Sequence, residues 1–495
     1  MNIPPANKRV LIVGGSGLWC NRTHHPAILA LKQVGFRLQV AAICDPVDPY
    51  KNSQHQNLLD VLALDKPLWL FNADKTALFA QLSALHQEKP FDLMITACDP
   101  VDHLPYCQWA AEHKIPVICD KPLLVHANAA SDLKAAQAIQ TEYSAIAQEF
   151  FAANINVFMN LGYRYDPMFI KVAQQLRQVY EMTGEGISYF NLFSNSGIKR
   201  FNKEFFTAAG HGYLAGVGSA SHTCYHLIDL MAWFLQNAPG KVAQLKLSLP
   251  YILRVKDYIR AQKSAPLARY FQNDNELPDG ISEAELEAVM EAEYDFNLHI
   301  QLLDEEGKLL GLMQLFNCHS GYSDRVSDYE PEQLRPNCQP QGGRMKQMSF
   351  DIHQGSIHNI HIVRNNVVHQ QYKAHVFRRL SPVLGLGDVF SEHIEREPSL
   401  GLTETGEVAR PPFRLDTELT MHCIKQSLGA GVELGTLKSL AGFHNQALSQ
   451  AIFAKLYELI AYDCVKKKIP ETPEIDTTIV LEDYLQTSNI AGYII

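Results

Sequence analysis

The sequence predicts an α/β protein in which a doubly wound parallel sheet is followed by an α+β domain with a large, mostly antiparallel sheet. Two observations predict this arrangement. In the first part of the chain, short and nearly continuous apolar runs are separated by helical stretches, which is typical of a parallel sheet covered on both faces. From about Gly186 onward, apolar and polar residues alternate within the runs, which is typical of antiparallel strands with one solvated face.

The first part alternates strands and helices. Its predicted strands are Arg9–Val13, Leu38–Cys44, Phe91–Ala97, Pro116–Cys119 and Ile155–Leu161. Its predicted helices are Pro26–Val34, Leu104–His113 and Ala129–Phe150. Right-handed crossovers between the parallel strands would place these helices on both faces of the sheet.

In the second part, apolar and polar residues alternate along the predicted strands. Its predicted strands are Ile187–Phe193, Phe296–Leu303, Leu309–Phe316 and Ile357–Val363. Two polar, Pro-rich stretches are expected to be long loops or insertions, at Ala265–Gly280 and Tyr322–Gly343. The end of the chain is helical, with an apolar stripe through Leu448–Ile460. We therefore expect a first domain at residues 1–165, an α+β domain with insertions at residues 166–400, and a helical extension packed on the preceding domain at residues 401–495.

Composition limits the class of protein. The 495 residues are 46% hydrophobic and 19% charged, as in ordinary globular domains. The net charge of -10 argues against nucleic acid or an anionic membrane as the main partner. The start of the chain lacks an apolar secretory segment, and the ten cysteines form no CxxC pair, so we expect a cytoplasmic protein with reduced thiols.

A glycine-rich turn follows the first predicted strand. In the dinucleotide-binding pattern, the first glycine, Gly15, permits a tight turn, and the second, Gly17, leaves room for a pyrophosphate to approach backbone N–H groups. The third position of that pattern is Cys20 instead of glycine, so the match is imperfect. We expect Gly15, Ser16, Gly17 and Leu18 to bind the cofactor.

Asp45 ends the second predicted strand, where dinucleotide-binding domains place an acidic residue for the adenosine ribose. A carboxylate there repels a 2′-phosphate, so Asp45 favours NAD over NADP. The alternative is that Asp45-Pro46 only forms a turn.

Four motifs occur in a fixed order along the chain. They are His24-His25-Pro26-Ala27, the segment Asp92–Leu123, Tyr163–Pro167 and Gly216–Leu235. The second motif contains a turn, a helix bearing His103 and a strand that ends in Asp120-Lys121-Pro122. In this order the motifs resemble the Gfo/Idh/MocA oxidoreductase family, named for glucose–fructose oxidoreductase and inositol dehydrogenase, whose corresponding strand usually ends in Glu-Lys-Pro.

The resemblance implies an NAD(P)-binding Rossmann domain and a cis Lys121-Pro122 peptide bond. It implies further cofactor contacts from Thr96, Asp99, His103, Asp120 and Lys121. It also implies substrate contacts from Arg164, Tyr165, His222 and Asp229. The family's sugar specificity implies a small sugar-like substrate, and its assemblies imply a homodimer or homotetramer formed through the open face of the second sheet.

Oxidation of a sugar-like alcohol needs a hydride acceptor, a base and a group that polarises the forming carbonyl. NAD would be the hydride acceptor. His226 is the candidate base, because an imidazole accepts and returns a proton near neutrality. Lys121 would stabilise the developing charge on the reacting oxygen. Alternatively, His226 is a hydrogen-bonded core histidine, and Lys121 is a solvated lysine after a buried strand.

His222 departs from the family pattern, which has a catalytic aspartate four residues before His226. In an α-helix, His222, His226 and Asp229 would share one face. Either the substrate differs, with an anionic group that meets His222, or turnover is impaired. The same three residues suggest zinc, but there is no HExxH glutamate and no clear further ligand, so we predict no metal site.

The leading hypothesis is an NAD(P)-dependent oxidoreductase that transfers a hydride between nicotinamide and a hydroxyl or carbonyl of a sugar, cyclitol or sugar derivative. A second hypothesis is an NAD-dependent glycoside hydrolase that oxidises its substrate transiently. A third is a non-catalytic NAD(P)-binding ligand sensor on the same scaffold. The substitution at His222 favours the sensor, whereas Lys121 and His226 favour an enzyme.

Overall fold

The structure is a computed structural model. It describes residues 7–47, 55–196, 200, 202–206, 213–264, 280–321, 347–367, 371–385, 394–396, 401–402, 408–409, 415–429 and 441–484. Nearly all of the two predicted long loops, Ala265–Gly280 and Tyr322–Gly343, lies outside these residues.

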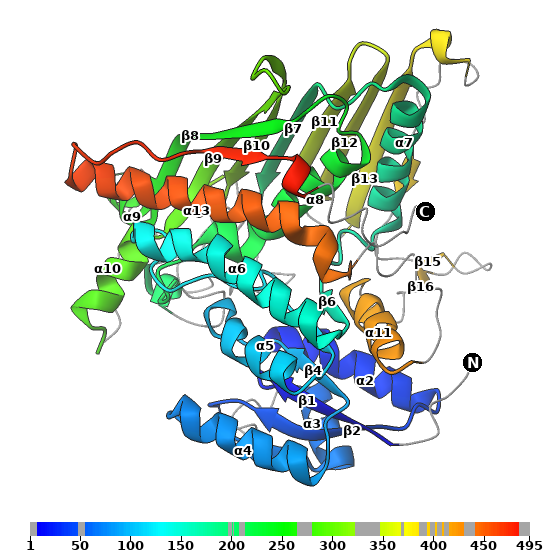
Figure 1. The fold of residues 1–495 in the computed structure, drawn as a ribbon, viewed down its shortest axis with the longest axis vertical. Helices are drawn as coiled ribbons and strands as arrows, with labels where there is room; N and C mark the ends of the chain where they lie inside the picture. The colour runs from blue at the N-terminus through cyan, green and yellow to red at the C-terminus, as the bar shows by residue number, and fades with distance from the viewer. Residues whose placement is uncertain are drawn as a thin grey trace.

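The first domain is built on a six-stranded parallel sheet with the strand order β3-β2-β1-β4-β5-β6 (Figure 1). Its strands are β1 (Lys8–Val13), β2 (Leu38–Cys44), β3 (Leu68–Leu70), β4 (Leu93–Thr96), β5 (Val117–Cys119) and β6 (Val157–Met159). The strand order reverses between β1 and β4, and ligands bind at such a reversal, beyond the carboxyl ends of the strands. The predicted doubly wound sheet is confirmed, with β3 as a strand that was not predicted.

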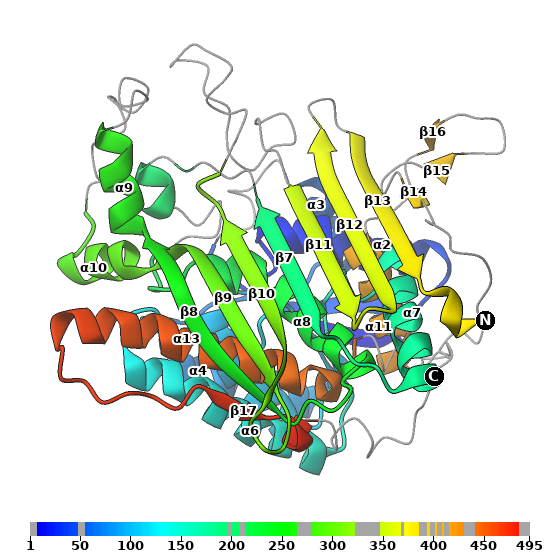
Figure 2. The same ribbon diagram turned by 90° about the horizontal axis from the view of Figure 1, so that it is seen from above.

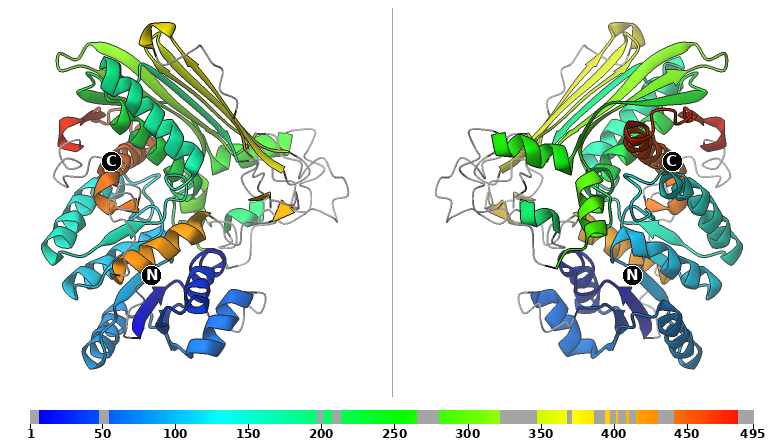
Figure 3. Two further views of the ribbon diagram at one scale, coloured as in Figure 1. Left: turned by 90° about the vertical axis from the view of Figure 1, so that its right-hand side faces the viewer. Right: turned by 90° about the vertical axis from the view of Figure 1, so that its left-hand side faces the viewer.

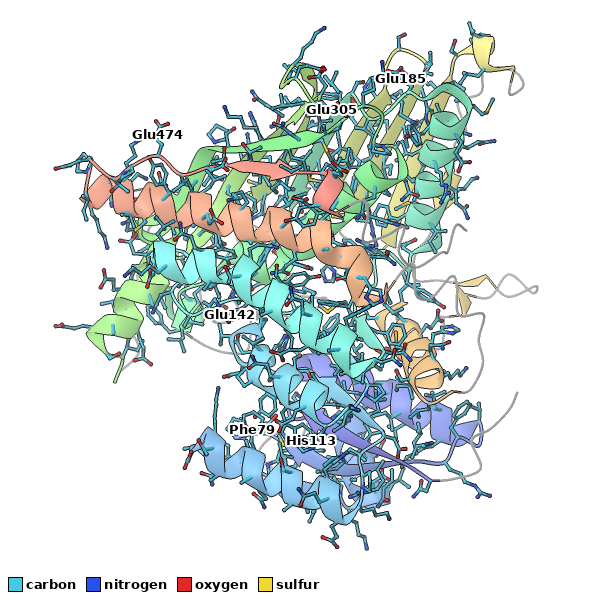
Figure 4. All side chains as sticks on the ribbon, viewed as in Figure 1. Phe79, His113, Glu142, Glu185, Glu305 and Glu474 are labelled. Atoms are coloured by element: carbon cyan, nitrogen blue, oxygen red, sulfur yellow. The ribbon has the colours of Figure 1, made fainter. Side chains whose placement is uncertain are left out.

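Helices cover both faces of this sheet. One face packs against α2 (His24–Gln33) and α3 (Gln56–Asp65), which follow the short α1 (Leu18–Arg22). The other face packs against α4 (Lys75–Glu88), α5 (His103–Glu112) and α6 (Leu133–Ala153). The Phe79 and Tyr106 rings join α4 to α5 with their centroids 5.1 Å apart, and Figure 4 shows Phe79 and His113 where these helices meet.

The second sheet has nine strands in the order β14-β13-β12-β11-β7-β10-β9-β8-β17. They are β7 (Tyr189–Asn195), β8 (Gln244–Arg254), β9 (Glu293–Leu303), β10 (Leu309–Cys318), β11 (Gln347–Gln354), β12 (His358–Val367), β13 (Gln371–Leu380), β14 (Ile394–Arg396) and β17 (Thr478–Val480). Every neighbouring pair is antiparallel except β7 with β10. The predicted, mostly antiparallel sheet is therefore confirmed. A separate pair consists of β15 (Gly401–Leu402) and β16 (Val408–Ala409).

Helices pack on one face of the second sheet (Figure 3). They are α7 (Pro167–Thr183), α8 (Tyr225–Asn237) and α13 (Ala447–Lys468). Figure 2 looks onto the opposite face, and side chains along β11 alternate between buried and partly exposed, as expected for a sheet covered on one side. Two further helices, α9 (Val255–Ser264) and α10 (Glu283–Glu291), pack together near the end of β8.

The C-terminal segment contacts both domains, whereas we had expected it to pack on the α+β domain. Its helix α11 (Leu415–Ser427) buries Leu419, Cys423 and Ile424 against the first sheet, beside α2 (Figure 1). These side chains lie in one hydrophobic cluster with Ile118 of β5 and Phe158 of β6. The helix α13 packs instead on α6 and α8. Within the described part of the chain, no helix is both long and apolar enough to cross a membrane.

Candidate active site

The glycine-rich loop joins β1 to α1 at the carboxyl edge of the first sheet. The positive φ of +81° falls at Gly14, where an added Cβ would overlap the backbone of Cys98. Gly15, which we had expected to allow the turn, instead packs closely against the Ile43 side chain. A Cβ at Gly17 would meet only the Gly14 carbonyl oxygen, at 3.5 Å, so the loop leaves open space where a pyrophosphate is expected.

Two histidines that were not predicted as site residues contact the backbone carbonyl groups of this loop. The Nε2 atom of His25 lies 2.8 Å from the Gly15 carbonyl oxygen, and Nδ1 of His55 lies 3.0 Å from the Ser16 carbonyl oxygen. Burial lowers the pKa of His25 to about 4, so this imidazole is neutral and donates its Nε2–H. Cys20, at the third position of the pattern, is fully buried, with its Sγ 3.5 Å from the Nε2 of His25.

Asp45 lies where the sequence predicted it, at the carboxyl end of β2. Its Oδ2 accepts a hydrogen bond from the Ser16 N–H and its Oδ1 accepts one from the Val47 N–H, both at 2.8 Å. Each carboxylate oxygen offers two lone pairs, so both retain one for a ribose hydroxyl. The carboxylate thus links the loop to the adenosine position predicted for it.

The Asp120-Lys121-Pro122 turn follows β5, and its Lys121-Pro122 peptide bond is cis, as the resemblance implied. The Oδ1 of Asp120 lies 3.1 Å from both the Nε2 of His24 and the Nδ2 of Asn160. Burial alone would raise the pKa of Asp120, but these two partners hold it below its usual value. Asp120 is therefore a charged group anchored by His24 and Asn160, and a cofactor contact from Asp120 stays a prediction.

His103 and Thr96 were predicted to contact the cofactor, but both side chains are completely buried in this structure. His103 points its two ring nitrogens at backbone carbonyl oxygens, that of Pro122 at 3.0 Å and that of Cys98 at 3.1 Å. It thus fixes the turn around the cis peptide bond. Asp99 is exposed and accepts the Val101 N–H, so a cofactor contact from Asp99 stays a prediction.

The Lys121 ammonium reaches from the first domain to the turn before α8. It donates hydrogen bonds to the carbonyl oxygens of Ser221, at 3.4 Å, and His222. Burial is the largest influence on its pKa and lowers it to about 8. A lysine with this pKa is mostly charged at neutral pH yet loses its proton within the range in which enzymes work.

The predicted catalytic helix begins with a π-helical turn, Ala220–Cys224, before α8 starts at Tyr225. The wider turn changes the spacing on which a shared face for the two histidines depended. The Nε2 of His222 lies 3.2 Å from the Val217 carbonyl oxygen, and its ring packs edge-on against Tyr213. The half-buried His226 packs instead against the Tyr163 ring, with centroids 5.2 Å apart. The two histidines thus have different neighbours, and their placement on one shared face stays a prediction.

Arg164 and Asp229, both predicted to bind substrate, form a buried ion pair with each other. The Arg164 Nε and Nη2 atoms lie 2.7 and 2.6 Å from the two Asp229 oxygens, and each side chain is 1% exposed. Ser449 of α13 also donates to Asp229 Oδ1, at 2.7 Å. A substrate contact from either residue would require this pair to open, and it stays a prediction. Tyr165 is half-buried against His422 of α11, and its substrate contact stays a prediction.

A buried carboxylate holds the glycine-rich turn that carries these groups. Glu293 Oε1 accepts hydrogen bonds from the Gly218 N–H, the Ala220 N–H and the Tyr457 hydroxyl, each at 3.0 Å. A Cβ at Gly218 would overlap the Glu293 backbone, so this position requires glycine. Despite these hydrogen bonds, burial raises the pKa of Glu293 to about 7.

This raised pKa predicts that stability falls as pH rises. A carboxyl with a folded pKa of about 7 and an ordinary value of 4.5 stabilises the fold fully below pH 4.5. That contribution, on the order of 3 kcal/mol, is lost as the pH rises through 7. We expect Glu293→Gln to keep the Oε1 contacts and to flatten the change in urea midpoint between pH 5 and pH 8. An unchanged pH dependence in the variant would contradict this assignment.

Comparison with known proteins agrees with the geometry of the first domain. Residues 8–148 match the family model described as an oxidoreductase family with an NAD-binding Rossmann fold, Gfo/Idh/MocA. This region is a Gfo/Idh/MocA NAD-binding domain. The predicted family, oxidoreductase class and NAD cofactor are thereby confirmed. No curated protein sequence matches the chain.

Solved structures resemble the whole chain in fold. A levoglucosan dehydrogenase in complex with NADH and levoglucosan is 14% identical, with 95% of this chain and all of that chain covered and a TM-score of 0.52. The apo form of levoglucosan dehydrogenase is 12% identical, covering 96% and 98%, with a TM-score of 0.53. An oxidoreductase from Pseudomonas syringae is 13% identical, covering 96% and 99%, with a TM-score of 0.50. At these identities the likeness establishes the fold, in which a Gfo/Idh/MocA domain precedes a large sheet.

No group of three or more histidine, cysteine or carboxylate side chains is arranged to hold a metal ion among the residues that the structure describes. The π-helical turn directs His222 to the Val217 carbonyl, and Asp229 is bound to Arg164. The zinc alternative for these residues therefore has no geometric support in the described part of the chain.

Proposed function

We propose that this protein is an NAD-dependent oxidoreductase that transfers a hydride between nicotinamide and a hydroxyl or carbonyl group of a sugar, cyclitol or sugar derivative. The observation that carries the proposal is the position of Lys121. Its partly buried ammonium belongs to the residue before the cis peptide bond, at the carboxyl edge of the parallel sheet, and contacts the turn that leads to His226. A cation fixed there is suited to stabilise negative charge on a reacting oxygen.

The chain's residues divide the work of such a reaction. The N–H groups of the glycine-rich loop and the Asp45 carboxylate would hold NAD, which supplies the hydride acceptor when bound. Lys121 would donate a hydrogen bond to the substrate oxygen, and His226 would take the hydroxyl proton. Three further residues would hold the backbone of the site in place. His25 fixes the glycine-rich loop, His103 fixes the turn at Pro122, and Glu293 fixes the turn at Gly218.

Asp45 offers a test of cofactor selection. We expect Asp45→Ala to raise the affinity for NADP relative to NAD by about tenfold, because the carboxylate no longer repels a 2′-phosphate. Calorimetric titration of both cofactors with the parent and the variant measures the ratio. A ratio that does not change would mean that Asp45 only holds Ser16 and Val47.

The proposed reaction is tested by titrating NAD and then screening sugars and cyclitols for the appearance of NADH. A substrate whose turnover is lost in His226→Ala supports the proposal. Glycosidic bond cleavage with no net NADH would favour the hydrolase, and NAD binding with a ligand but no turnover would favour the sensor. Absence of NAD binding would contradict all three functions.

We also propose that the chain assembles as a homodimer or homotetramer through the open face of the second sheet. The exposed Tyr189 and Tyr251 lie on β7 and β8 of this sheet, and Phe316 of β10 packs against Tyr251 with the ring centroids 5.9 Å apart. Apolar surface of this kind favours association. Light scattering measures the mass in solution, and a monomer at high concentration would contradict the proposal. The cytoplasmic location stays a prediction.

A further inference from the structure

The ring of Tyr163 lies directly against the candidate base, His226. The two ring centroids are 5.2 Å apart, and the angle of 36° between the ring planes is closer to stacked than to perpendicular. Tyr163 belongs to the turn between β6 and α7, where its carbonyl oxygen accepts the Asp166 N–H at 3.2 Å. The segment that joins the two domains therefore places an aromatic ring against the imidazole of α8.

The residue after Tyr163 fixes this turn to the helix that carries His226. Arg164 forms its buried ion pair with Asp229, which lies three residues after His226 on α8. Residues three apart in an α-helix are neighbours on its surface. The ion pair therefore holds the turn against α8 at the level where Tyr163 contacts His226.

Two further contacts fix the ring of Tyr163 itself. The completely buried Phe169 of α7 has its ring centroid 5.7 Å from that of Tyr163. Arg364 of β12 places its guanidinium carbon 5.2 Å from the centroid of the Tyr163 ring, which is a cation–π distance. The Nη2 of Arg364 lies 3.9 Å from the Oδ2 of Asp166, the residue that begins α7 as its N-cap. Contacts from both domains thus keep the ring beside His226.

The charged and titratable groups on the elements around His226 have partners of their own. They are Asp229, bound to Arg164; His222, directed to the Val217 carbonyl; Lys121, bound to the carbonyl groups of Ser221 and His222; His319 of β10, against the Thr223 hydroxyl; Lys455 and Glu458 of α13, paired with each other; and Arg364, beside Asp166. The family pattern has a carboxylate at the position of His222. Here the group in direct contact with the imidazole is the Tyr163 ring.

This contact suits a base that becomes a cation. When His226 takes the hydroxyl proton, its imidazole gains a positive charge, and the face of a tyrosine ring attracts a cation that lies within about 6 Å of its centroid. We propose that Tyr163 is a positioning residue that orients His226 and stabilises its protonated form, in place of the carboxylate that the family pattern has where this chain has His222. The proposal rests on the proposed function, in which His226 is the base.

The test removes the ring and follows the protonation of His226. In Tyr163→Leu, the midpoint of the His226 titration should fall by about half a pH unit, the shift expected when an imidazolium loses one cation–π contact. The titration is measured by NMR of the imidazole signals after labelling of histidine with carbon-13, and His226→Ala identifies the signal. This readout needs neither a substrate nor turnover.

Kinetics provide a second readout. His226 must be neutral to accept the hydroxyl proton, so the acidic limb of kcat/KM for alcohol oxidation should move to lower pH by the same half unit in Tyr163→Leu. At the plateau, kcat should fall by about threefold, the factor that corresponds to half a pH unit, with KM little changed. Tyr163→Phe keeps the ring and should retain both the parent titration and the parent pH profile.

Matched variants separate this role from packing. Tyr180→Leu removes another partly buried tyrosine ring near the end of α7 and should leave the His226 titration unchanged. Circular dichroism and NAD titration establish that each variant is folded, and Tyr163→Met, with a flexible side chain that fills irregular space, repeats the test if the leucine variant unfolds. A folded variant without the ring that keeps the parent His226 titration would overturn the proposal, even if its stability is lower. A shifted titration in a protein that oxidises no substrate would overturn only the proposed function.

Discussion

Replacing Lys121 by methionine should lower kcat by about 10²–10³-fold, the usual cost of removing a group that stabilises charge in the transition state. NAD affinity should change by only a few-fold, because the glycine-rich loop and Asp45 contribute most of the predicted cofactor contacts. Methionine keeps the length and apolar stem of lysine, so the variant removes mainly the ammonium. Single-turnover kinetics of NADH formation and calorimetric titration of NAD measure the two effects separately.

The pH dependence of the parent enzyme provides an independent check on this role. Burial lowers the pKa of Lys121 to about 8, so the charged form needed to polarise the oxygen is lost above that pH. We therefore expect kcat/KM for alcohol oxidation to fall above about pH 8. The exposed Lys134, replaced by methionine, serves as the control and should leave the profile unchanged. A Lys121→Met enzyme with full kcat would contradict the proposed mechanism.

The fold of the first domain could be predicted from the sequence because its signal is local. Strands such as β1 and β2 are apolar runs buried on both faces, and each ends in a turn that the sequence marks. The strand β3 was missed because it has three residues, of which Leu68 is exposed. A short edge strand with little burial has too weak a pattern to be distinguished from a loop.

The candidate site was predicted only in part, because its geometry depends on contacts between distant segments. The motif order located Lys121 and its cis peptide bond, but helical spacing could not reveal the π-helical turn that contains His222. Glu293 reaches the site from a position far along the chain.

For Arg164 and Asp229, the sequence identified the residues but not their contacts. Each residue belongs to a motif of the family, so the resemblance placed both at the substrate. In the structure the two side chains satisfy each other, and Arg164 Nη2 also donates to the Asn445 carbonyl oxygen at 3.2 Å. The motifs identified both residues, but only their contacts show that they form an ion pair with each other.

Breaking this ion pair should produce the largest loss of stability among our predictions. In Asp229→Asn, the Arg164 guanidinium would remain buried without its carboxylate, which typically costs about 3–5 kcal/mol. The pair also joins α8 to α13 through Ser449, so the loss should loosen the packing of the helix that carries His226. We expect a lower urea midpoint for the variant, with the change measured by circular dichroism at constant NAD concentration.

A double substitution distinguishes a structural pair from a substrate-binding pair. Arg164→Met combined with Asp229→Leu replaces both charges by apolar groups, a change that is often nearly neutral for a buried pair. If the pair is structural, the double variant should be more stable than Asp229→Asn and should retain much of the parent's substrate affinity. If the two residues bind substrate, Asp229→Asn should instead raise KM at nearly unchanged stability, and the double variant should bind substrate no better. That second pattern would restore the roles implied by the motifs and would require a conformation in which the pair opens.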